Sequence, residues 1–383
     1  MKKTFKMALL FAVVALASCG GNDSSKSQGD VKVEGWQDEE TTYAKRYVKP
    51  SEIKPGENNF HTAVQQAYIE SSWDMVSKFA KGEAELSLPD VTKIDISGEE
   101  SKTYIQIATD PEFSDARVFL PNDENTLGFY NLLLGTKYYW RCGDSFDFSS
   151  SVVHEFVTTS FAPRNLFVDG VTNVRDLGGY SSKLGGKIRQ GLFYRGGALT
   201  RGSSSPTSLM SEKGYKTLSK TLGVKTEIDM RMTLSKNENP ENGNMDDSMF
   251  KEIRYVSVPI DWHSDNMMLD RKEEIRDIFK TYAVEENYPI YLHCSIGTDR
   301  TGLVSYLMGA LLGIHYDDLY KDYLFSNFGA IGSSRDESAI IKYQNTLKSY
   351  KKKTLAECAE AYLTDIGLTA AEVASIRETM IEK

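Results

Sequence analysis

Basic charge is scarce in this 383-residue chain. Lys and Arg number 45 against 54 Asp and Glu, the formal net charge is −9, and the longest basic run is the lysine triplet at 351–353. Because a protein that neutralises nucleic-acid phosphates needs a basic face, no nucleic-acid partner is predicted. The triplet is expected on a solvated helix face.

A long apolar run is also missing. Three lysines precede the apolar stretch 7–17, which is too short to span a bilayer and is typical of a secretory signal. The following letters LASC, ending at Cys19, resemble a bacterial lipobox. We therefore predict cleavage after residue 18, lipidation of Cys19 (palmitate among the chains) and an exported lipoprotein on the periplasmic or surface face of the outer membrane. A plain signal peptide with an incidental cysteine is the alternative.

Histidine and cysteine are few. None of the five histidines stands at ligand spacing from an acid or a cysteine, so no metal and no other cofactor is predicted. With Cys19 lipidated, Cys142, Cys294 and Cys358 remain. An odd number argues against a disulfide framework and favours a free thiol, for which Cys294 is the candidate.

The residue composition and the hydrophobic periodicity change along the chain. After the signal peptide, 1–18, the polar residues 19–50 are predicted to form a flexible tether. Residues 51–83 carry a partial helical stripe. Residues 84–159 hold short alternating segments such as TYIQIAT, which predict a small all-β sandwich of unknown partner. Its segment LGTKYYWR, from Leu134, resembles a strand of a fibronectin type III-like domain.

Strands alternate with helices from residue 163 to 383. The predicted strands are 224–230, 253–258 and 290–293. Apolar residues between 275 and 282 fall on one helical face, and 303–312 is a predicted buried helix. This alternation predicts an α/β fold, with a central, mostly parallel sheet flanked by helices, behind the sandwich.

The most informative stretch is PIYLHCSIGTDRTG, which begins at Pro289. We expect a strand, a loop over 294–300, and a helix from Thr301. Unpaired N–H groups and the helix dipole favour an anion at such a junction. Gly297 and Gly302 let the backbone curl, so that successive amides form an anion nest.

Cys294 and Arg300 give this loop its chemistry. Arg300 can bind two phosphate oxygens with its guanidinium fork. The same environment would lower the pKa of the Cys294 thiol from its ordinary value of about 8.5. A thiolate beneath a bound phosphate is a nucleophile aimed at phosphorus.

The string HCxxGxDRTG resembles the loop of the bacterial atypical cysteine-dependent protein-tyrosine phosphatases. Further matches are NVRDLGGY from Asn173, GLFYRGGAL from Gly191, LG with IDMR between Leu222 and Arg231, and DYL with Asn327. The resemblance spans about residues 163–382. Gly196 stands where serine is usual, and Thr298 stands where members that also act on phosphoinositides carry lysine.

The resemblance implies the cysteine-phosphatase fold and hydrolysis of phosphotyrosine through a phosphocysteine on Cys294. Arg300 would bind phosphate and stabilise its equatorial oxygens. His293 would tune Cys294, with a purely packed histidine as the alternative. Thr301 would hydrogen-bond the thiolate, or serve only as a helix N-terminal residue. The phosphate-binding residues would be Ser295, Ile296, Gly297, Thr298, Asp299 and Arg300. Supporting residues would be Arg175, Asp176 and Arg195.

The departing oxygen needs a proton, and two carboxyl groups are candidates to donate it. Asp261 follows a predicted strand, as the mobile acid loop of tyrosine phosphatases does, and is preferred. Asp299 lies within the loop, where its other role would be to orient Arg195 or the loop backbone. Two alternatives for the whole protein stay open: a phosphatase of inositol phosphates or other small phosphomonoesters, and an inert phosphate-binding surface lipoprotein.

Overall fold

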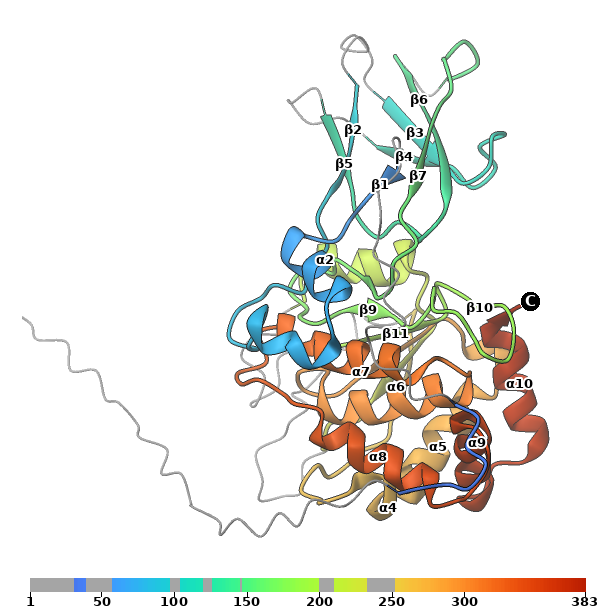
Figure 1. Ribbon diagram of the computed structural model, residues 1–383. Coiled ribbons are helices and arrows are strands. Elements are labelled where there is room, and N and C mark those ends of the chain that lie inside the picture. Colours follow the sequence, from blue (N-terminus) through green and yellow to red (C-terminus); the bar gives the residue numbers. More distant parts are fainter. Residues whose placement is uncertain are drawn as a thin grey trace, which may run out of the picture. The chain divides into compact units, whose positions relative to one another are not determined.

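The computed structural model describes residues 31–38, 57–96, 104–119, 126–144, 147–199, 210–232 and 252–383 (Figure 1). The predicted signal peptide and Cys19 lie outside these residues. Within them, no helix combines the length and the apolar character needed to cross a bilayer.

Residues 31–38, which we expected in a flexible tether, are docked on the folded part of the chain. Trp36 packs against the largest core, and the Lys348 ammonium lies 5.1 Å from its ring centroid. Asp38 forms an ion pair with Lys183 (2.8 Å). The polar composition of the tether gave no sign of this docking, which the packing of the Trp36 ring favours.

Seven short strands within the described residues 57–158 form two sheets. One has the order β1-β7-β6-β3-β4, and the other pairs β2 with β5. Both sheets contribute to one core, which includes Ile94, Ile107, Phe129 and Trp140. Two sheets closed on a shared core form a β-sandwich. The strands are β1 (Glu57–Asn58), β2 (Thr92–Asp95), β3 (Tyr104–Ala108), β4 (Arg117–Phe119), β5 (Thr126–Phe129), β6 (Lys137–Gly143) and β7 (His154–Thr158).

The segment predicted as helical at 51–83 also supplies a strand to this sandwich. β1 pairs in parallel with β7, the last strand of the sandwich. The chain then turns helical at Thr62, whose side chain and backbone exchange hydrogen bonds with Gln65 in a capping box. The helical elements that follow are α2 (Ala63–Glu70) and the 3₁₀ helix η1 (Trp73–Lys78).

A six-stranded sheet of order β13-β12-β14-β11-β9-β8 organises the second half of the chain. The strands from β13 to β11 run parallel, whereas β9 and β8 are antiparallel to their neighbours. The predicted α/β fold with a mostly parallel sheet is confirmed. The strands are β8 (Arg164–Asn165), β9 (Arg175–Asp176), β11 (Phe193–Gly196), β12 (Thr226–Asp229), β13 (Arg254–Ser257) and β14 (Ile290–His293), with β10 (Lys187–Ile188) and β15 (Ile381–Glu382) paired separately.

Helices cover both faces of this sheet. Successive strand residues point to opposite faces, so Phe193 lies in the larger core and Tyr194 in the smaller one. The larger core includes the predicted helical face at 275–282, and the smaller core includes Leu218. The helices are α3 (Glu212–Lys216), η2 (Thr217–Thr221), α4 (Met267–Asp270), α5 (Lys272–Tyr282), η3 (Glu285–Asn287), α6 (Asp299–Leu311), α7 (Tyr316–Leu324), η4 (Phe325–Phe328), α8 (Ser338–Lys348), α9 (Leu355–Asp365) and α10 (Ala370–Met380) (Figure 1).

Candidate active site

The strand–loop–helix junction has the predicted arrangement, with a shorter loop. β14 ends at His293, and α6 begins at Asp299 rather than at Thr301. Arg300 therefore lies in the first helical turn, and the loop consists of residues 294–298. The positive end of a 13-residue helix faces the carboxyl edge of the sheet.

Two glycines allow close contacts of strand β11, one with this loop and one with Tyr291 of β14. Gly297 has a φ of +71°, and a Cβ there would lie 2.3 Å from the Gly196 carbonyl oxygen. A Cβ on Gly196 would lie 2.3 Å from the Tyr291 hydroxyl. The serine usual at position 196 in similar proteins would therefore not fit behind this tyrosine.

Hydrogen bonds hold the carbonyl groups of the loop on its outer side. The Ser295 carbonyl accepts from the Ala198 amide at 3.0 Å. The Ile296 and Gly297 carbonyls accept from the Asn173 side-chain amide at 3.2 and 3.1 Å. In a trans peptide the carbonyl and the next N–H point in opposite directions. The amides that follow these carbonyls therefore face the interior of the loop, as an anion nest requires.

Cys294 lies at the base of this nest with 2% of its surface exposed. Burial alone would raise the pKa of the thiol, but the Arg300 charge and the Thr301 hydroxyl and amide bring it below its ordinary value. The Thr301 hydroxyl makes no regular hydrogen bond within the described residues. A thiolate on Cys294 is thus the acceptor that this hydroxyl can serve.

Arg300 bridges the ends of two parallel strands beside the thiol. Its Nη1 donates to the carbonyl of Met230, just after β12, at 3.1 Å. The same nitrogen donates to the carbonyl of Ile260, beyond β13, at 3.3 Å. These bonds fix the guanidinium at the carboxyl edge of the sheet, where its fork can bind phosphate oxygens.

Two buried arginines share one carboxylate behind the loop. Asp322 of α7 accepts from Arg175 at 2.8 Å and from Arg195 at 2.7 Å. Arg195 also donates to the Gly297 carbonyl at 2.9 Å, and Arg175 to the Asn173 side-chain oxygen at 2.6 Å. Burial would raise the pKa of Asp322, but the two arginines lower it. Two cations against one anion leave positive charge behind the loop, which favours a thiolate.

Asp176 lies apart from this network, although it neighbours Arg175 in the sequence. It pairs with Arg164 at 2.7 Å and accepts from the amides of Gly178 (2.8 Å) and Gly191 (2.6 Å). Adjacent strand residues point to opposite faces. Asp176 therefore supports the segment that begins at Asn173, and Arg175 is the residue that joins the network of Asp322 and Asn173 behind the loop.

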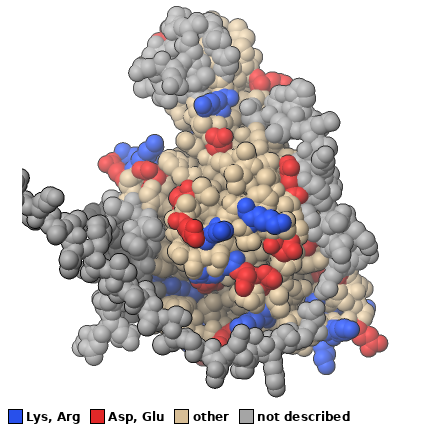
Figure 2. All heavy atoms as spheres, turned by 60° about the vertical axis from the view of Figure 1, so that its left-hand side comes forward, with Lys and Arg blue, Asp and Glu red and all other residues tan. Residues whose placement is uncertain are grey.

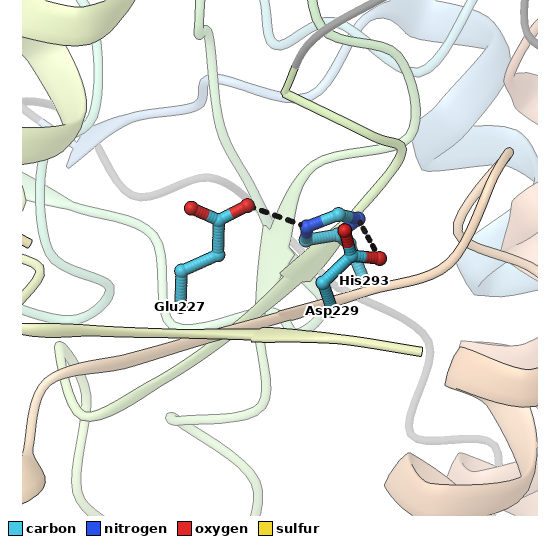
Figure 3. A group of neighbouring side chains, drawn as sticks. All are labelled: Glu227, Asp229 and His293. Carbon is cyan, nitrogen blue, oxygen red and sulfur yellow. Dashed lines mark hydrogen bonds and ion pairs between the residues drawn. The ribbon is translucent and has the colours of Figure 1, made fainter. Parts of the chain in front are cut away.

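His293 belongs to a buried cluster with two acids of β12 (Figure 3). Its Nε2 lies 2.8 Å from Glu227, its Nδ1 lies 3.7 Å from Asp229, and the same Nδ1 lies 3.0 Å from the Cys294 carbonyl. Burial would lower the pKa of His293, but Asp229 and Glu227 raise it. The imidazole thus ties Cys294 to the sheet, which fits the predicted tuning role.

These three side chains also have the spacing of a metal site, with ligand atoms within 4.8 Å of one another. Arg231, however, forms a buried ion pair with Asp229 at 2.8 Å. A guanidinium already supplies the positive charge that a metal would bring. The group is best described as an ion cluster, and the chemistry of the site needs no metal in it.

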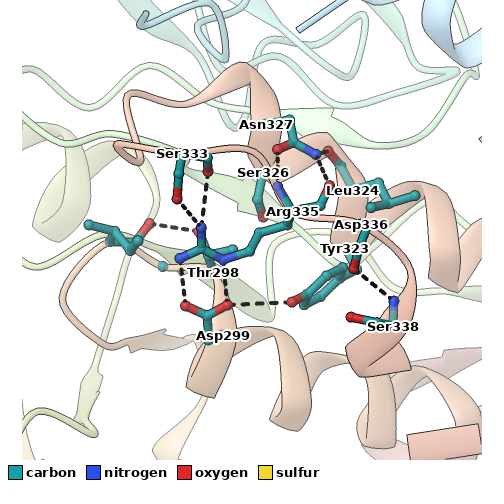
Figure 4. Close-up of polar contacts among 12 residues, drawn as sticks. Thr298, Asp299, Tyr323, Leu324, Ser326, Asn327, Ser333, Arg335, Asp336 and Ser338 are labelled. Carbon is teal, nitrogen blue, oxygen red and sulfur yellow. Dashed lines mark hydrogen bonds and ion pairs between the residues drawn. The ribbon is translucent and has the colours of Figure 1, made fainter. Parts of the chain in front are cut away.

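Asp299 pairs with Arg335, whereas Arg195, the residue that it was considered to orient, pairs with Asp322. Asp299 accepts two hydrogen bonds from Arg335, at 2.8 and 3.0 Å, as Figure 4 shows. Together with Trp262 and Tyr323 it lines a pocket of about 310 Å³. This pocket opens beside the phosphate loop and can hold the rest of a substrate.

Asp261 directly follows Ile260, whose carbonyl accepts a hydrogen bond from the Arg300 guanidinium. Its carboxylate interacts with the His263 ring at 2.8 Å and with Arg271 at 3.2 Å. Hydrogen bonds from His263, together with the Arg271 charge, lower the pKa of Asp261. These contacts favour the ionised form of this carboxyl group, and Asp261 is not among the residues that line the pocket beside Asp299, although its neighbour Trp262 is.

Several residues of this site had no role predicted from the sequence. Asp322 and Asn173 stood in segments that matched the family, without an assigned partner. Glu227 alternates with Asp229 and Arg231 on a buried strand, and this alternation of charges was a usable signal. Nothing in the sequence near Arg335 indicates that it binds Asp299.

Comparison with known proteins identifies the family of this chain. The profile of the family described as "Tyrosine phosphatase family" matches residues 166–382. A Cupriavidus necator protein, named as a tyrosine-protein phosphatase, is 27% identical over 187 residues. That match covers 43% of this chain and 63% of the relative, so the chain spans just under two thirds of it.

Two solved structures are similar over part of the chain. The core catalytic domain of the PP-IP phosphatase SIW14 from S. cerevisiae has a TM-score of 0.28 and 16% identity, covering 40% of this chain and 78% of that one. TpbA of P. aeruginosa in complex with pTyr has a TM-score of 0.25 and 18% identity, covering 49% and 85%. The assignment rests instead on the family profile, which covers more than half of the chain. The chain belongs to the tyrosine phosphatase family.

Proposed function

We propose that this protein hydrolyses phosphate monoesters, with phosphotyrosine as the preferred substrate. The observation that carries the proposal is a buried Cys294 with a lowered pKa, beneath inward-facing amides and beside Arg300. Such a pocket stabilises negative charge on the sulfur and on a bound phosphate. An inert binding module would not need an activated thiol.

The reaction proceeds in two displacements. The Cys294 thiolate attacks phosphorus, the S–P bond forms, and the bond to the tyrosyl oxygen breaks. A carboxylic acid gives that oxygen its proton. The resulting carboxylate then takes a proton from water, which attacks phosphorus and breaks the S–P bond. Inorganic phosphate leaves, and the thiolate is restored with Arg300 and Thr301 as its partners.

The surface fits a phosphorylated protein or small molecule better than a nucleic acid. Figure 2 shows basic and acidic side chains interspersed over the described part of one face, with no broad basic area. The pocket beside Asp299 is lined by the aromatic rings of Trp262, Tyr323 and Tyr343. Aromatic walls suit a phenyl ring beyond the phosphate.

Turnover of a substrate panel by the full-length protein tests this proposal. We expect a higher kcat/KM for a phosphotyrosyl peptide than for inositol phosphates, since Thr298 supplies no cation for further phosphates. Faster turnover of inositol phosphates would favour the alternative phosphatase. Binding of phosphate without turnover of any substrate would favour the inert module.

Replacement of the two candidate acids should identify the proton donor. The pocket geometry moves our preference from Asp261 to Asp299, because Asp299 lines the pocket and Asp261 does not. We expect Asp299→Asn to lose about 100-fold in kcat on phosphotyrosine, within the range for a general acid. With p-nitrophenyl phosphate, whose leaving group needs little protonation, the loss should be much smaller. The same contrast in Asp261→Asn alone would assign the role to Asp261.

Two further proposals concern the N-terminal part of the chain. We propose that Cys19 carries a lipid that anchors the protein to the outer membrane, and that the sandwich is fibronectin type III-like. Their support is the LASC sequence and the strand pattern around Leu134. Radiolabelled palmitate should enter the wild type and be absent from Cys19→Ala. Equal label in the two proteins would contradict the anchor.

A further inference from the structure

The segment at residues 80–88 lies outside the part of the chain that matches the family, yet it runs beside the catalytic domain. We call this segment the brace. Its Gly82 amide donates to the Asn327 carbonyl at 2.7 Å, and the Ile331 amide donates to the Gly82 carbonyl at 3.0 Å. A Cβ on Gly82, whose φ is +74°, would lie 2.7 Å from Ile331. The two backbones are thus in close contact.

Helix α2 fixes the other edge of the brace. Gln65, which is fully buried, donates from its side-chain amide to the carbonyls of Leu86 (2.7 Å) and Leu88 (2.8 Å). Tyr68 of the same helix is 1% exposed and lies 5.5 Å, ring to ring, from Phe328. In Figure 1 this blue part of the chain lies beside the orange helix α7.

The brace ends in two polar side chains that continue to the phosphate loop. The backbone amide of Asn173 donates to the Ser87 hydroxyl at 3.0 Å. The Thr172 hydroxyl donates to the Glu85 carboxylate. The Ser87 amide donates to the same carboxylate at 3.0 Å. Glu85 and Ser87 thereby hold two consecutive residues, Thr172 and Asn173.

Asn173 is the link between the brace and the loop. Its φ of +61° is unusual for a residue other than glycine, so its conformation must be held by its surroundings. In this conformation its side-chain amide binds the Ile296 and Gly297 carbonyls. These are the carbonyls whose outward orientation turns the next amides toward the interior of the loop.

We propose that Glu85 and Ser87, two residues of the brace, are positioning residues for the phosphate loop. They act through Asn173 and touch neither the phosphate nor the sulfur. The proposal rests on the proposed function of the loop as a phosphate site. It implies that a fragment starting at residue 163, the boundary predicted for the catalytic domain, lacks part of its active site.

Substitution of Ser87 in the full-length protein tests this proposal. We expect Ser87→Ala to lower kcat on p-nitrophenyl phosphate by about 10- to 100-fold, since small misplacements of catalytic groups have effects of this size. Binding of inorganic phosphate, measured by calorimetry, should weaken. The pH at which Cys294 becomes half-reactive toward iodoacetamide should rise. Ser87→Thr, which keeps the hydroxyl, should restore all three values.

The matched control is Glu83→Gln, because Glu83 is an exposed acid of the brace itself. We expect wild-type values from Glu83→Gln and reduced values from Glu85→Gln. A lower melting temperature of Ser87→Ala with unchanged phosphate affinity and unchanged Cys294 reactivity would overturn the proposal. Phosphate affinity and thiol reactivity require no turnover. They therefore test the brace even if the wild type hydrolyses none of the substrates.

Discussion

Cys294→Ser should abolish turnover while leaving phosphate binding intact. A serine hydroxyl is not ionised near neutral pH, so the inward-facing amides and Arg300 would surround a group that cannot attack phosphorus. Loss of a catalytic nucleophile commonly costs about 10⁶-fold in kcat, and we expect at least about 10⁴-fold here. Release of phosphate from p-nitrophenyl phosphate measures the loss, and calorimetry with inorganic phosphate measures the remaining affinity.

Cys358→Ser is the matched control for this substitution. Cys358 is also a free, buried cysteine, but burial in helix α9 raises the pKa of its thiol. We expect its replacement to leave kcat unchanged. Equal activity of the wild type and Cys294→Ser would show that the reaction does not pass through this sulfur, and the proposed mechanism would then be wrong.

Asp322→Asn should be the most destabilising single substitution that we predict. It would leave the guanidinium groups of Arg175 and Arg195 buried without a negative partner. Removing one partner of a buried ion pair costs about 3–5 kcal/mol. For a domain of this size we expect the melting temperature to fall by about 10 °C. Activity should fall as well, because Arg195 would no longer be held against the Gly297 carbonyl.

The effect of Asp322→Asn should also depend on pH. Because the pKa of Asp322 is lowered in the folded protein, its contribution to stability is complete above the unfolded value of about 3.9. It is lost as the pH falls through the folded value. The difference from the wild type should therefore be full at neutral pH and shrink in acid. Asp277→Asn, which removes an exposed ion pair with Arg276, should change little at any pH.

The sequence predicted those parts of the site that depend on neighbours along the chain. The apolar run before His293, the glycines of the loop and the spacing of Cys294 and Arg300 all lie within one strand–loop–helix unit. Local periodicity and backbone conformation determine such a unit. Only the start of the helix differs from the prediction, since α6 begins at Asp299 and not at Thr301.

What the sequence could not predict are the partners that meet only through the fold. The pairing of β14 with β12 brings Glu227 and Asp229 to His293, and α7 brings Asp322 to Arg175. No spacing in the chain encodes these contacts, which form when elements distant in sequence pack together. The contacts of the brace with the catalytic domain could not be predicted from the sequence for the same reason.

The proton donor could not be identified from the sequence for a further physical reason. Both Asp261 and Asp299 follow structural elements that end at the same edge of the sheet, so their positions in the sequence are equally suitable. Only the contacts separate them. Each carboxylate has a cationic partner, Arg271 for Asp261 and Arg335 for Asp299, but only Asp299 lines the pocket next to the loop.

The reactivity of Cys294 as a function of pH tests the central claim most directly. Iodoacetamide alkylation of this residue, followed by mass spectrometry, reports the fraction of thiolate at each pH. We predict half-maximal reactivity below the ordinary thiol value of about 8.5, and a shift to higher pH in Arg300→Ala. Half-maximal reactivity at or above that value in the wild type would contradict an anion-stabilising pocket around the sulfur.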